Sequence, residues 1–270
     1  MKIILSRKGF DSKYGGIPSP ILPDRKTLLS MPIPSDDGTL SYKDLHYDGI
    51  TYHEILRQLA PKKKYDICHL DPDIRAEVRI SPIEKWDAAF GQIGSPQGFL
   101  RNNQIQKGDL FLFFGRFRQT IGNMNEGTLR YEKHAPILHI IFGYLEIGRV
   151  VNNDNLCEVG DMNCSWHPHG AGKRLKDKSN TLYLAADTLS FDMKQRGWGS
   201  FSYSANKILT MSDRTATWRE IPCLMPDKVV GNRKNSAVGG GLYYSGIWQE
   251  LILMESEAAC VWAKEIILGN

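Results

Sequence analysis

The chain has 270 residues, of which 41% are hydrophobic, and a formal net charge of +4. The hydrophobic content suffices for a buried core, and the mildly basic charge permits a nucleic-acid partner without requiring one. Five cysteines at irregular spacing exclude a disulfide framework and favour a reducing cytoplasm. The apolar runs are shorter than the roughly 20 residues of a membrane helix, and no signal-peptide pattern opens the chain. We therefore expect a cytoplasmic protein with no membrane partner.

The first predicted element is a strand over residues 1–5, followed by a loop over residues 6–20 that is rich in Gly, Pro and Ser. Glycines allow close approach to the backbone, and successive N–H groups in such a loop can bind an anion. A long turn with solvated charges is the alternative, and the spacing excludes a Walker loop. The candidate phosphate- or substrate-binding residues of this loop are Arg7, Lys8, Asp11, Ser12, Gly15, Gly16 and Ser19.

A helix is predicted over residues 51–59, because its apolar side chains recur at helical spacing. A strand over residues 65–70 follows, and polar side chains gather where it ends. Functional side chains often lie at such strand ends, so His69, Asp71 and Asp73 are candidate catalytic acid–base groups. The alternative is a strand that ends in an Asp-Pro turn and caps a following helix.

Residues 81–89 are predicted to form another helix, because they begin with Ser-Pro and have the spacing of a capping box. Residues 91–100 are predicted to be a flexible, amide-rich loop that leads into the central strands. In this loop Gln92 and Gln97 are candidates to contact the edge of a base. The alternative is that both glutamines are simply solvated.

Two apolar stretches, residues 108–115 and 137–151, are predicted to be the central strands of the fold. Their near-continuous apolar character indicates burial on both faces, and His139 is predicted to be a satisfied core residue. The pattern resembles the β-barrel of PUA-like domains, including the ASCH and EVE branches, over residues 100–155 approximately. We expect an α+β, mainly β fold with a central antiparallel barrel or sheet, a few helices and long loops.

A group of Cys and His residues follows the central strands. The spacing from Cys157 through Cys164 to His167 and His169 does not match a zinc pattern, which usually pairs its ligands closely, so we expect no metal site. Pro168 holds the backbone between the two histidines extended, and both imidazoles can then point into one pocket. His167 and His169 are therefore candidate catalytic residues, and a purely structural pair is the alternative.

The rest of the chain is predicted to add a strand over residues 181–186, a strand over residues 248–253 and a closing helix or strand over residues 256–268. An aromatic turn over residues 197–203 contains Trp198, a candidate stacking platform for a base. Packing of these aromatic rings in the core or at a sheet edge is the alternative. No repeat, low-complexity tract or linker divides the sequence, so we expect one domain.

Several of these motifs together resemble the third type of the nucleotide-modification-associated domain family, over essentially the whole chain. The motifs that carry the resemblance are residues 6–12, 15–20, 69–73, 90–92, 108–115, 167–169, 180–183 and 248–250. Members of that family look like components of phage and bacterial systems that make or handle modified DNA bases. The resemblance implies a single such domain over residues 1–270 and a role in DNA base hypermodification.

Taken together, the motifs favour an enzyme that modifies a DNA base or a nucleotide in a pocket built from these segments. In this pocket Arg7 and Lys8 hold a phosphate, Asp71 or a histidine transfers a proton, and Trp198 holds a flipped or free base. The expected partners are DNA or a nucleotide, and other enzymes of a base-modification pathway. The sequence does not indicate a cofactor, a target base or a reaction type.

The main alternative is a non-enzymatic, PUA-like reader that binds a modified base without changing it. A transferase or toxin acting on a nucleotide cofactor such as NAD has only Arg7 and Glu250 in its favour. The first two classes differ in what substitutions do. In an enzyme, Asp71→Asn or His167→Ala abolishes turnover and largely spares binding, whereas changes to a reader's aromatic or arginine contacts lower its affinity.

Overall fold

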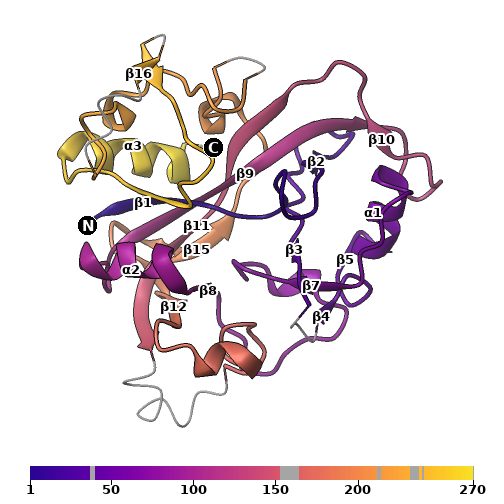
Figure 1. Cartoon of the computed structure of the whole chain (residues 1–270), viewed down its shortest axis with the longest axis horizontal. Helices are drawn as coiled ribbons and strands as arrows, with labels where there is room; N and C mark the ends of the chain where they lie inside the picture. Colours follow the sequence, from indigo (N-terminus) through magenta and orange to yellow (C-terminus); the bar gives the residue numbers. More distant parts are fainter. Residues whose placement is uncertain (37–39, 153–163, 212–213, 232–236, 239, 270) are drawn as a thin grey trace.

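The computed structural model describes residues 1–36, 40–152, 164–211, 214–231, 237–238 and 240–269. The largest element in this part of the chain is a nine-stranded mixed sheet (Figure 1). Its main path runs in the order β18 (Glu250–Ile252), β1 (Ile3–Arg7), β9 (Leu110–Ile121), β11 (Ile137–Asn152), β12 (Thr181–Ala185) and β8 (Ala89–Gln92). The strands that join this path from the side are β2 (Ser19–Ile21), β10 (Arg130–Tyr131) and β15 (Trp198–Ser200).

The long antiparallel pair of β9 and β11 forms the centre of the sheet, as the two apolar stretches predict. On β11 the predicted core role of His139 is confirmed, because its Nδ1 accepts a 3.0 Å hydrogen bond from Trp218 Nε1. β1 pairs in parallel with β9, with Ile4 opposite Phe111, and in the antiparallel sense with β18, with Ile4 opposite Ile252. The sheet is therefore mixed. The parallel pairing is possible because a long crossover segment connects β1 to β9.

Both faces of the central strands are buried, which explains their uninterrupted apolar sequence. On one face Leu112 packs in a core that it shares with α3 (Glu257–Leu268) and the C-terminal segment. Phe111 and Phe113 point to the other face, where their ring centroids lie 4.8 and 5.4 Å from that of Phe90 on β8. Strands β11 and β12 separate β9 from β8 in the sheet, so this contact requires a strongly curled sheet.

The sheet is curled but open. β18 and β8 are its two edges, and in the residues that the structure describes no strand pairing joins them. Side chains bridge the edges instead, because Gln92 Nε2 of β8 donates a 2.6 Å hydrogen bond to Glu250 Oε1 of β18. The predicted α+β, mainly β class is confirmed. Of the predicted antiparallel barrel or sheet, the structure has a sheet, which is open and mixed, and this open sheet gives no support to the PUA-like resemblance.

Smaller sheets and short helices surround this centre. The small sheets contain β3 (Ile33–Pro34), β7 (Ile67–His69) and β4 (Leu40–Ser41); β5 (His46–Tyr47) and β6 (Ile50–Thr51); β13 (Thr188–Leu189) and β14 (Asp192–Arg196); and β16 (Ala237–Val238) and β17 (Gly241–Leu242). Short 3₁₀ helices span Ala76–Val78, Gly172–Lys176, Ala205–Lys207 and Pro222–Leu224. β7 is the strand that was predicted over residues 65–70.

Two of the predicted elements, one in the N-terminal part of the chain and one at its C-terminal end, are helices. α1 (Tyr52–Leu59) confirms the first predicted helix, and it begins with a capping box. The Glu54 backbone N–H donates to Thr51 Oγ1 at 3.2 Å, and the Thr51 backbone N–H donates to the Glu54 carboxylate at 2.9 Å. At the other end of the chain the closing segment is the helix α3, which Ser256 caps through the backbone N–H of Ala259.

The segment around β8 corrects two predictions. Residues 81–89 form no helix, because Lys85 has a φ of 56°, in the left-handed region that a right-handed helix excludes. A helix, α2 (Gly94–Asn102), forms where a loop was predicted. Pro96 lies in its first turn, where the missing N–H of proline loses no hydrogen bond, and Leu100 is fully buried.

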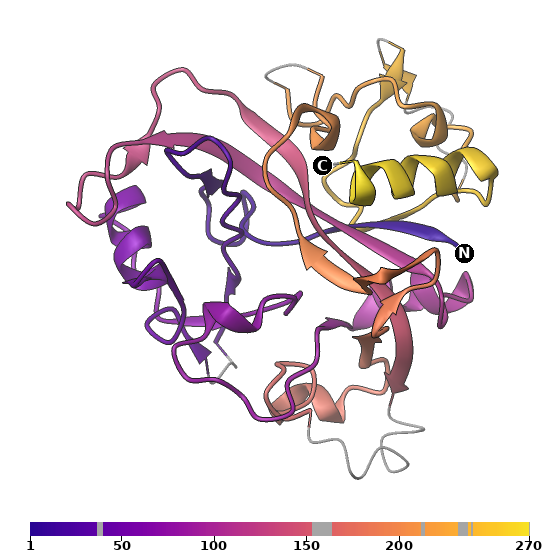
Figure 2. The ribbon, with the colours of Figure 1, turned by 180° about the vertical axis from the view of Figure 1, so that it is seen from behind.

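Opposite views of the molecule show α3 on one side of the long β9–β11 pair and α1 on the other (Figures 1 and 2). β7 and β8 lie on the same side as α1 (Figure 1). There the small sheet of β3, β7 and β4 meets β8, an edge strand of the large sheet. Lys8, Asp71 and the three histidines among the sequence candidates gather at this junction. Within the described ranges, none of the helices has the length and hydropathy that a bilayer crossing requires.

Candidate functional site

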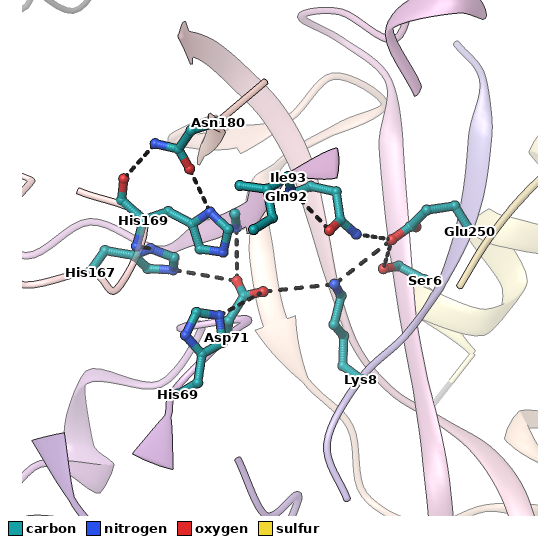
Figure 3. A network of polar contacts seen from close by, with 11 residues as sticks. Ser6, Lys8, His69, Asp71, Gln92, Ile93, His167, His169, Asn180 and Glu250 are labelled. Atoms are coloured by element: carbon teal, nitrogen blue, oxygen red, sulfur yellow. Dashed lines mark hydrogen bonds and ion pairs between the residues drawn. The ribbon is translucent and has the colours of Figure 1, made fainter. Parts of the chain in front are cut away.

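Asp71 is the centre of a buried polar cluster, just after β7 (Figure 3). The backbone N–H of Gly91 donates a 2.8 Å hydrogen bond to its Oδ1. Lys8 Nζ lies 3.7 Å from its Oδ2, and His167 Nε2 lies 3.4 Å from its Oδ1. Burial alone would raise the pKa of Asp71, but the charge of Lys8 and the contact with His167 bring that pKa well below its usual range. Asp71 is therefore a buried, ionised carboxylate.

Three histidines from two separate segments surround this carboxylate. His69 ends β7, and its Nε2 lies 3.9 Å from Asp71 Oδ2. His167 and His169 belong to the loop before β12, and the His169 ring centroid lies 5.1 Å from that of His69. All three imidazoles are buried. The structure thus brings these four sequence candidates together, while their catalytic roles stay predictions.

Asn180 fixes the orientation of the His169 ring. Its Nδ2 donates to the His169 backbone carbonyl at 2.8 Å, so its Oδ1 faces the ring and accepts a hydrogen bond from Nδ1 at 2.8 Å. Burial lowers the pKa of His169 to about 3 and that of His69 well below its usual range. Both imidazoles are therefore neutral at neutral pH, and His169 Nε2 carries a lone pair that can accept a hydrogen bond or bind a metal.

Lys8 connects Asp71 to a second buried carboxylate, Glu250. Its Nζ lies 3.8 Å from Glu250 Oε1, which also accepts hydrogen bonds from Ser6 Oγ at 3.0 Å and from Gln92 Nε2 at 2.6 Å. Burial raises the pKa of Glu250 to about 7, against the opposing effects of Lys8 and both hydrogen bonds. One carboxylate is thus ionised and the other titrates near neutral pH, as in sites that divide acid and base roles between two carboxyl groups.

A pocket of about 250 Å³ opens beside this cluster. Its lining combines guanidinium groups with buried polar groups, and it includes Arg7, Lys8, His69, Asp71, His169 and Arg174. Gln92 also lines it, as one of the two glutamines that were predicted to bind a base. Positive charge beside neutral imidazoles suits an anionic ligand that carries a polar ring.

Gly91 allows the cluster to pack closely. It lies on β8, and its N–H is the group that bonds to Asp71. A Cβ at this position would collide with the His169 ring. The edge strand β8 therefore positions two members of the cluster at once, one through a backbone donor and one through the missing side chain.

The predicted phosphate loop contributes its first part to the pocket. Arg7, Lys8 and Asp11 line the cavity. The Asp11 carboxylate itself accepts hydrogen bonds from the backbone N–H groups of Lys13 at 2.7 Å and Tyr14 at 2.6 Å. The anion position that was predicted in the loop backbone is therefore filled by a carboxylate of the chain.

The remaining candidates of this loop are not among the residues that line the pocket. The Gly15 carbonyl accepts a 2.9 Å hydrogen bond from Lys63 Nζ, and the Gly16 N–H donates within the loop. Ser19 is buried, and its Oγ accepts a backbone hydrogen bond from outside the loop. Ser12 is exposed. Their contacts are those of a structured turn.

His167 is not among the residues that line the pocket, and three further candidates also lie outside its lining. Asp73 Oδ2 forms a buried ion pair with Arg79 Nη2 at 2.6 Å. Gln97, on α2, accepts a 3.0 Å hydrogen bond from the Tyr183 hydroxyl. Trp198, on β15, packs edge-on against another tryptophan ring at 6.3 Å. Each of these residues has a structural partner that the sequence did not reveal.

Glu250 and Asn180 have no acid–base or binding role in the hypothesis that the sequence favoured. Glu250 begins β18. The feature of the sequence that could have revealed it is a carboxylate directly before the buried apolar residues of this strand. Asn180 directly precedes β12, and its signal was its place in the motif over residues 180–183.

The metal-ligating potential of the site lies in His69, Asp71 and His169. Each offers one ligand atom, and these atoms lie within 4.8 Å of one another. The Cys-His spacing in the sequence gave no such indication, since two of these residues come from a different segment. Of the cysteines in that pattern, Cys164 is buried and Cys157 lies outside the described residues.

Comparison with known proteins gives one family. A family model described as nucleotide modification associated domain 3 matches residues 2–241. No curated protein and no solved structure matches the chain significantly. The matched range contains Lys8, Asp71 and His169, whereas Glu250 lies beyond its end.

Proposed function

The chain belongs to the nucleotide modification associated domain 3 family, and we propose that it is an enzyme that chemically alters a base of DNA or of a free nucleotide in the pocket beside Asp71. The observation that carries this proposal is the lining of that pocket, where guanidinium groups lie beside a buried cluster of imidazoles and carboxylates. A nucleotide combines an anionic phosphate with a polar ring. The lining offers a chemical partner for each part.

Arg7 is the proposed phosphate contact. It lines the pocket, and its Nη2 lies 3.6 Å from Asp11 Oδ2, which is longer than a strong charge-assisted hydrogen bond. A phosphate would offer the guanidinium two parallel and shorter bonds. Arg174, from the loop before β12, lines the same pocket and adds positive charge for the same ligand.

The cluster around Asp71 is the proposed reacting centre. Asp71 is ionised and the His69 and His169 imidazoles are neutral, so at neutral pH the cluster offers lone pairs that can accept hydrogen bonds from a base. Glu250, whose pKa is raised to about 7, contacts the same Lys8 that approaches Asp71. A carboxyl group that titrates near neutral pH can give and take a proton there, which supports chemistry on the base over retention of the base alone.

The test is nucleoside mass spectrometry on the DNA and the nucleotide pool of cells that carry the gene and its neighbours. Asp71→Asn keeps an oxygen for the Gly91 N–H but removes the charge. Asp66→Asn is the matched control, because it makes the same change at an exposed residue just before β7. Equal abundance and equal thermal unfolding of the two variants establish that both fold.

We expect a modified nucleoside that disappears with Asp71→Asn, that persists with Asp66→Asn and whose precursor accumulates. A nucleoside profile that Asp71→Asn leaves unchanged would contradict the proposal. That outcome would point to a non-enzymatic reader, and binding of the purified protein to modified DNA would be measured next.

A further inference from the structure

We propose that His69, Asp71 and His169 form a binding site for a divalent first-row transition-metal ion. One ligand atom from each residue lies within 4.8 Å of the other two. An ion between them would draw these atoms to coordination distances of about 2.0–2.2 Å. Two imidazoles and one carboxylate suit zinc or iron, whereas magnesium and calcium prefer oxygen ligands. The role of the ion rests on the proposed function, whereas the presence of the ion does not.

An unsatisfied nitrogen in the cluster supports a missing binding partner. Within the described residues, His69 Nδ1 is buried and has no hydrogen-bond partner. Burying an imidazole nitrogen in this way costs free energy, so native proteins usually give such atoms a partner. A cluster of three buried histidines around one carboxylate therefore stabilises the fold less than an apolar core would. It is well suited to holding a cation.

His169 is already oriented as a ligand. Metal-binding histidines usually donate their second ring N–H to an oxygen, which fixes the tautomer and the ring orientation. Asn180 Oδ1 accepts that bond from His169 Nδ1 at 2.8 Å, and the other end of the Asn180 amide bonds to the His169 carbonyl at 2.8 Å. The Nε2 lone pair is thereby left for the ion. Asn180 is a positioning residue in this arrangement.

Lys8 is the group that competes with a metal ion for Asp71. Its ammonium lies 3.7 Å from Asp71 Oδ2, where a second cation would repel it. The structure provides Lys8 with another carboxylate, because Glu250 Oε1 lies only 3.8 Å from the same nitrogen. It also provides an aromatic face, the Phe90 ring at 4.0 Å. Lys8 can therefore move toward Glu250 when an ion occupies Asp71.

The site would be open on one side. His69, Asp71 and His169 all line the pocket of about 250 Å³. Three protein ligands leave coordination positions for water or a substrate atom, which is typical of catalytic sites and unlike closed structural ones. When bound, such an ion polarises a ligand oxygen or lowers the pKa of a bound water.

The test titrates the purified full chain, stripped with a chelator, with Co²⁺ as a visible probe for the zinc-type site and with Fe²⁺ under anaerobic conditions. Metal analysis of the protein as isolated gives the stoichiometry. His69→Gln and His169→Gln remove one ligand each. The control His134→Asn removes an exposed imidazole at a residue with a φ of 69°, where Asn is tolerated best after Gly.

We expect one equivalent of metal with the unaltered chain and with His134→Asn. We expect affinity to fall by about 100-fold or more in each ligand variant, and by about 10- to 100-fold in Asn180→Ala. Lys8→Met has the opposite expected effect, a gain of about tenfold, because it removes the competing charge and keeps an apolar chain against Phe90. A purely structural role of these residues would produce no such gain.

Weak binding to the unaltered chain, or equal affinity in the ligand variants and the control, would overturn the proposal. If a histidine variant does not fold, Asn180→Ala and Lys8→Met still test it, since neither residue is a ligand and their effects have opposite signs. The titration needs no nucleotide. A metal site can therefore fail while a modified nucleoside is still formed, and it can be present although no nucleoside changes.

Discussion

Lys8 is one positive charge placed between two buried carboxylates that differ in ionisation. Asp71 receives a backbone N–H and faces histidines, and its pKa is lowered, whereas burial raises the pKa of Glu250 to about 7. One ammonium cannot fully stabilise two anions in a desolvated site. At Glu250 burial outweighs Lys8 and the two hydrogen bonds, so this carboxyl group keeps its proton to a higher pH than Asp71 does. This inequality makes Glu250 the part of the network that responds to pH near neutrality.

The pH dependence of stability tests this assignment. Because the pKa of Glu250 is about 7 in the folded chain and about 4.5 in the unfolded one, the folded chain binds this proton more tightly. Its contribution to stability is complete below pH 4.5 and is lost as the pH rises through about 7. The loss amounts to about 3 kcal/mol in the free energy of unfolding. Urea denaturation at a series of pH values measures it.

Glu250→Gln keeps the shape of the side chain and should remove this component, so the difference between the chain and the variant should grow between pH 5 and pH 8. Glu255→Gln is the control, because that carboxylate is exposed and should change the pH profile little. A Glu250→Gln profile that runs parallel to the unaltered one would show that Glu250 is ionised throughout this range.

At the scale of single residues the sequence identified His69 and Asp71 because polar side chains gather at the end of a predicted strand, and His169 because it flanks a proline together with another histidine. The sequence did not distinguish these residues from Asp73, which forms a buried ion pair with Arg79. Arginine is usually exposed, so nothing in the sequence indicates that Arg79 is buried beside Asp73. The role of Glu250 depends on Lys8, more than two hundred residues away in the chain. Nothing local encodes that contact.

The edge strand β8 is the element on which the cluster depends most directly. Its four residues are all buried, and its neighbour in the sheet is β12, which directly follows Asn180. Gly91 lies opposite Leu182 in this pairing. The register of one short antiparallel pair therefore sets the distance between Asp71 and the loop that carries His169.

Gly91→Ala tests this dependence. The added methyl group would collide with the His169 ring, so we expect the ring to move and the modified nucleoside to be lost. Gly98→Ala is the matched control within the neighbouring helix α2, where an added Cβ meets no atom within 4 Å and should stabilise the helix by about 0.5–1 kcal/mol. Nucleoside mass spectrometry and thermal unfolding of both variants give the comparison. Full product formation by Gly91→Ala would show that the close packing is dispensable.

At the scale of elements the sequence predicted the strands β1, β7, β9, β11 and β12 and the helix α1, because their apolar periodicity and caps agree with their final burial. It failed around β8. The left-handed backbone at Lys85 is not visible in a segment that begins like a helix. The glycines and Pro96 of α2 have low helix propensity, and burial of Leu100 in the core outweighs that propensity.

The sheet as a whole depends on the C-terminal segment. β18 covers one side of β1, and α3 covers one face of the sheet. Both elements lie beyond residue 241, where the family match ends. The matched range is therefore smaller than the unit that packs together.

A truncated chain of residues 1–241 tests this point. It loses the strand beside β1 and the buried side chains of α3, so we expect broad, non-cooperative thermal unfolding and binding of a hydrophobic dye. A chain that ends at residue 268, just after α3, is the control and should unfold cooperatively. Sharp, dye-independent unfolding of the 1–241 chain would show that the matched range folds alone.

The curled, open sheet was not predictable from the sequence, although its apolar strands were. A near-continuous apolar run indicates a strand that is buried on both faces, and it says nothing about whether the outermost strands meet. Here they approach through Gln92 and Glu250 without backbone pairing. A barrel and this sheet differ only in that last contact.

The position of β1 between β9 and β18 has a consequence for protein synthesis. A ribosome adds roughly 5–20 residues per second, so β1 emerges roughly ten to fifty seconds before β18 can pair with it. During that interval Ile3, Ile4 and Leu5 form an apolar strand with an open edge, which another nascent chain can extend. β1, which is an interior strand of the folded sheet, therefore waits a long time for the strand that covers its second edge while the chain is being made.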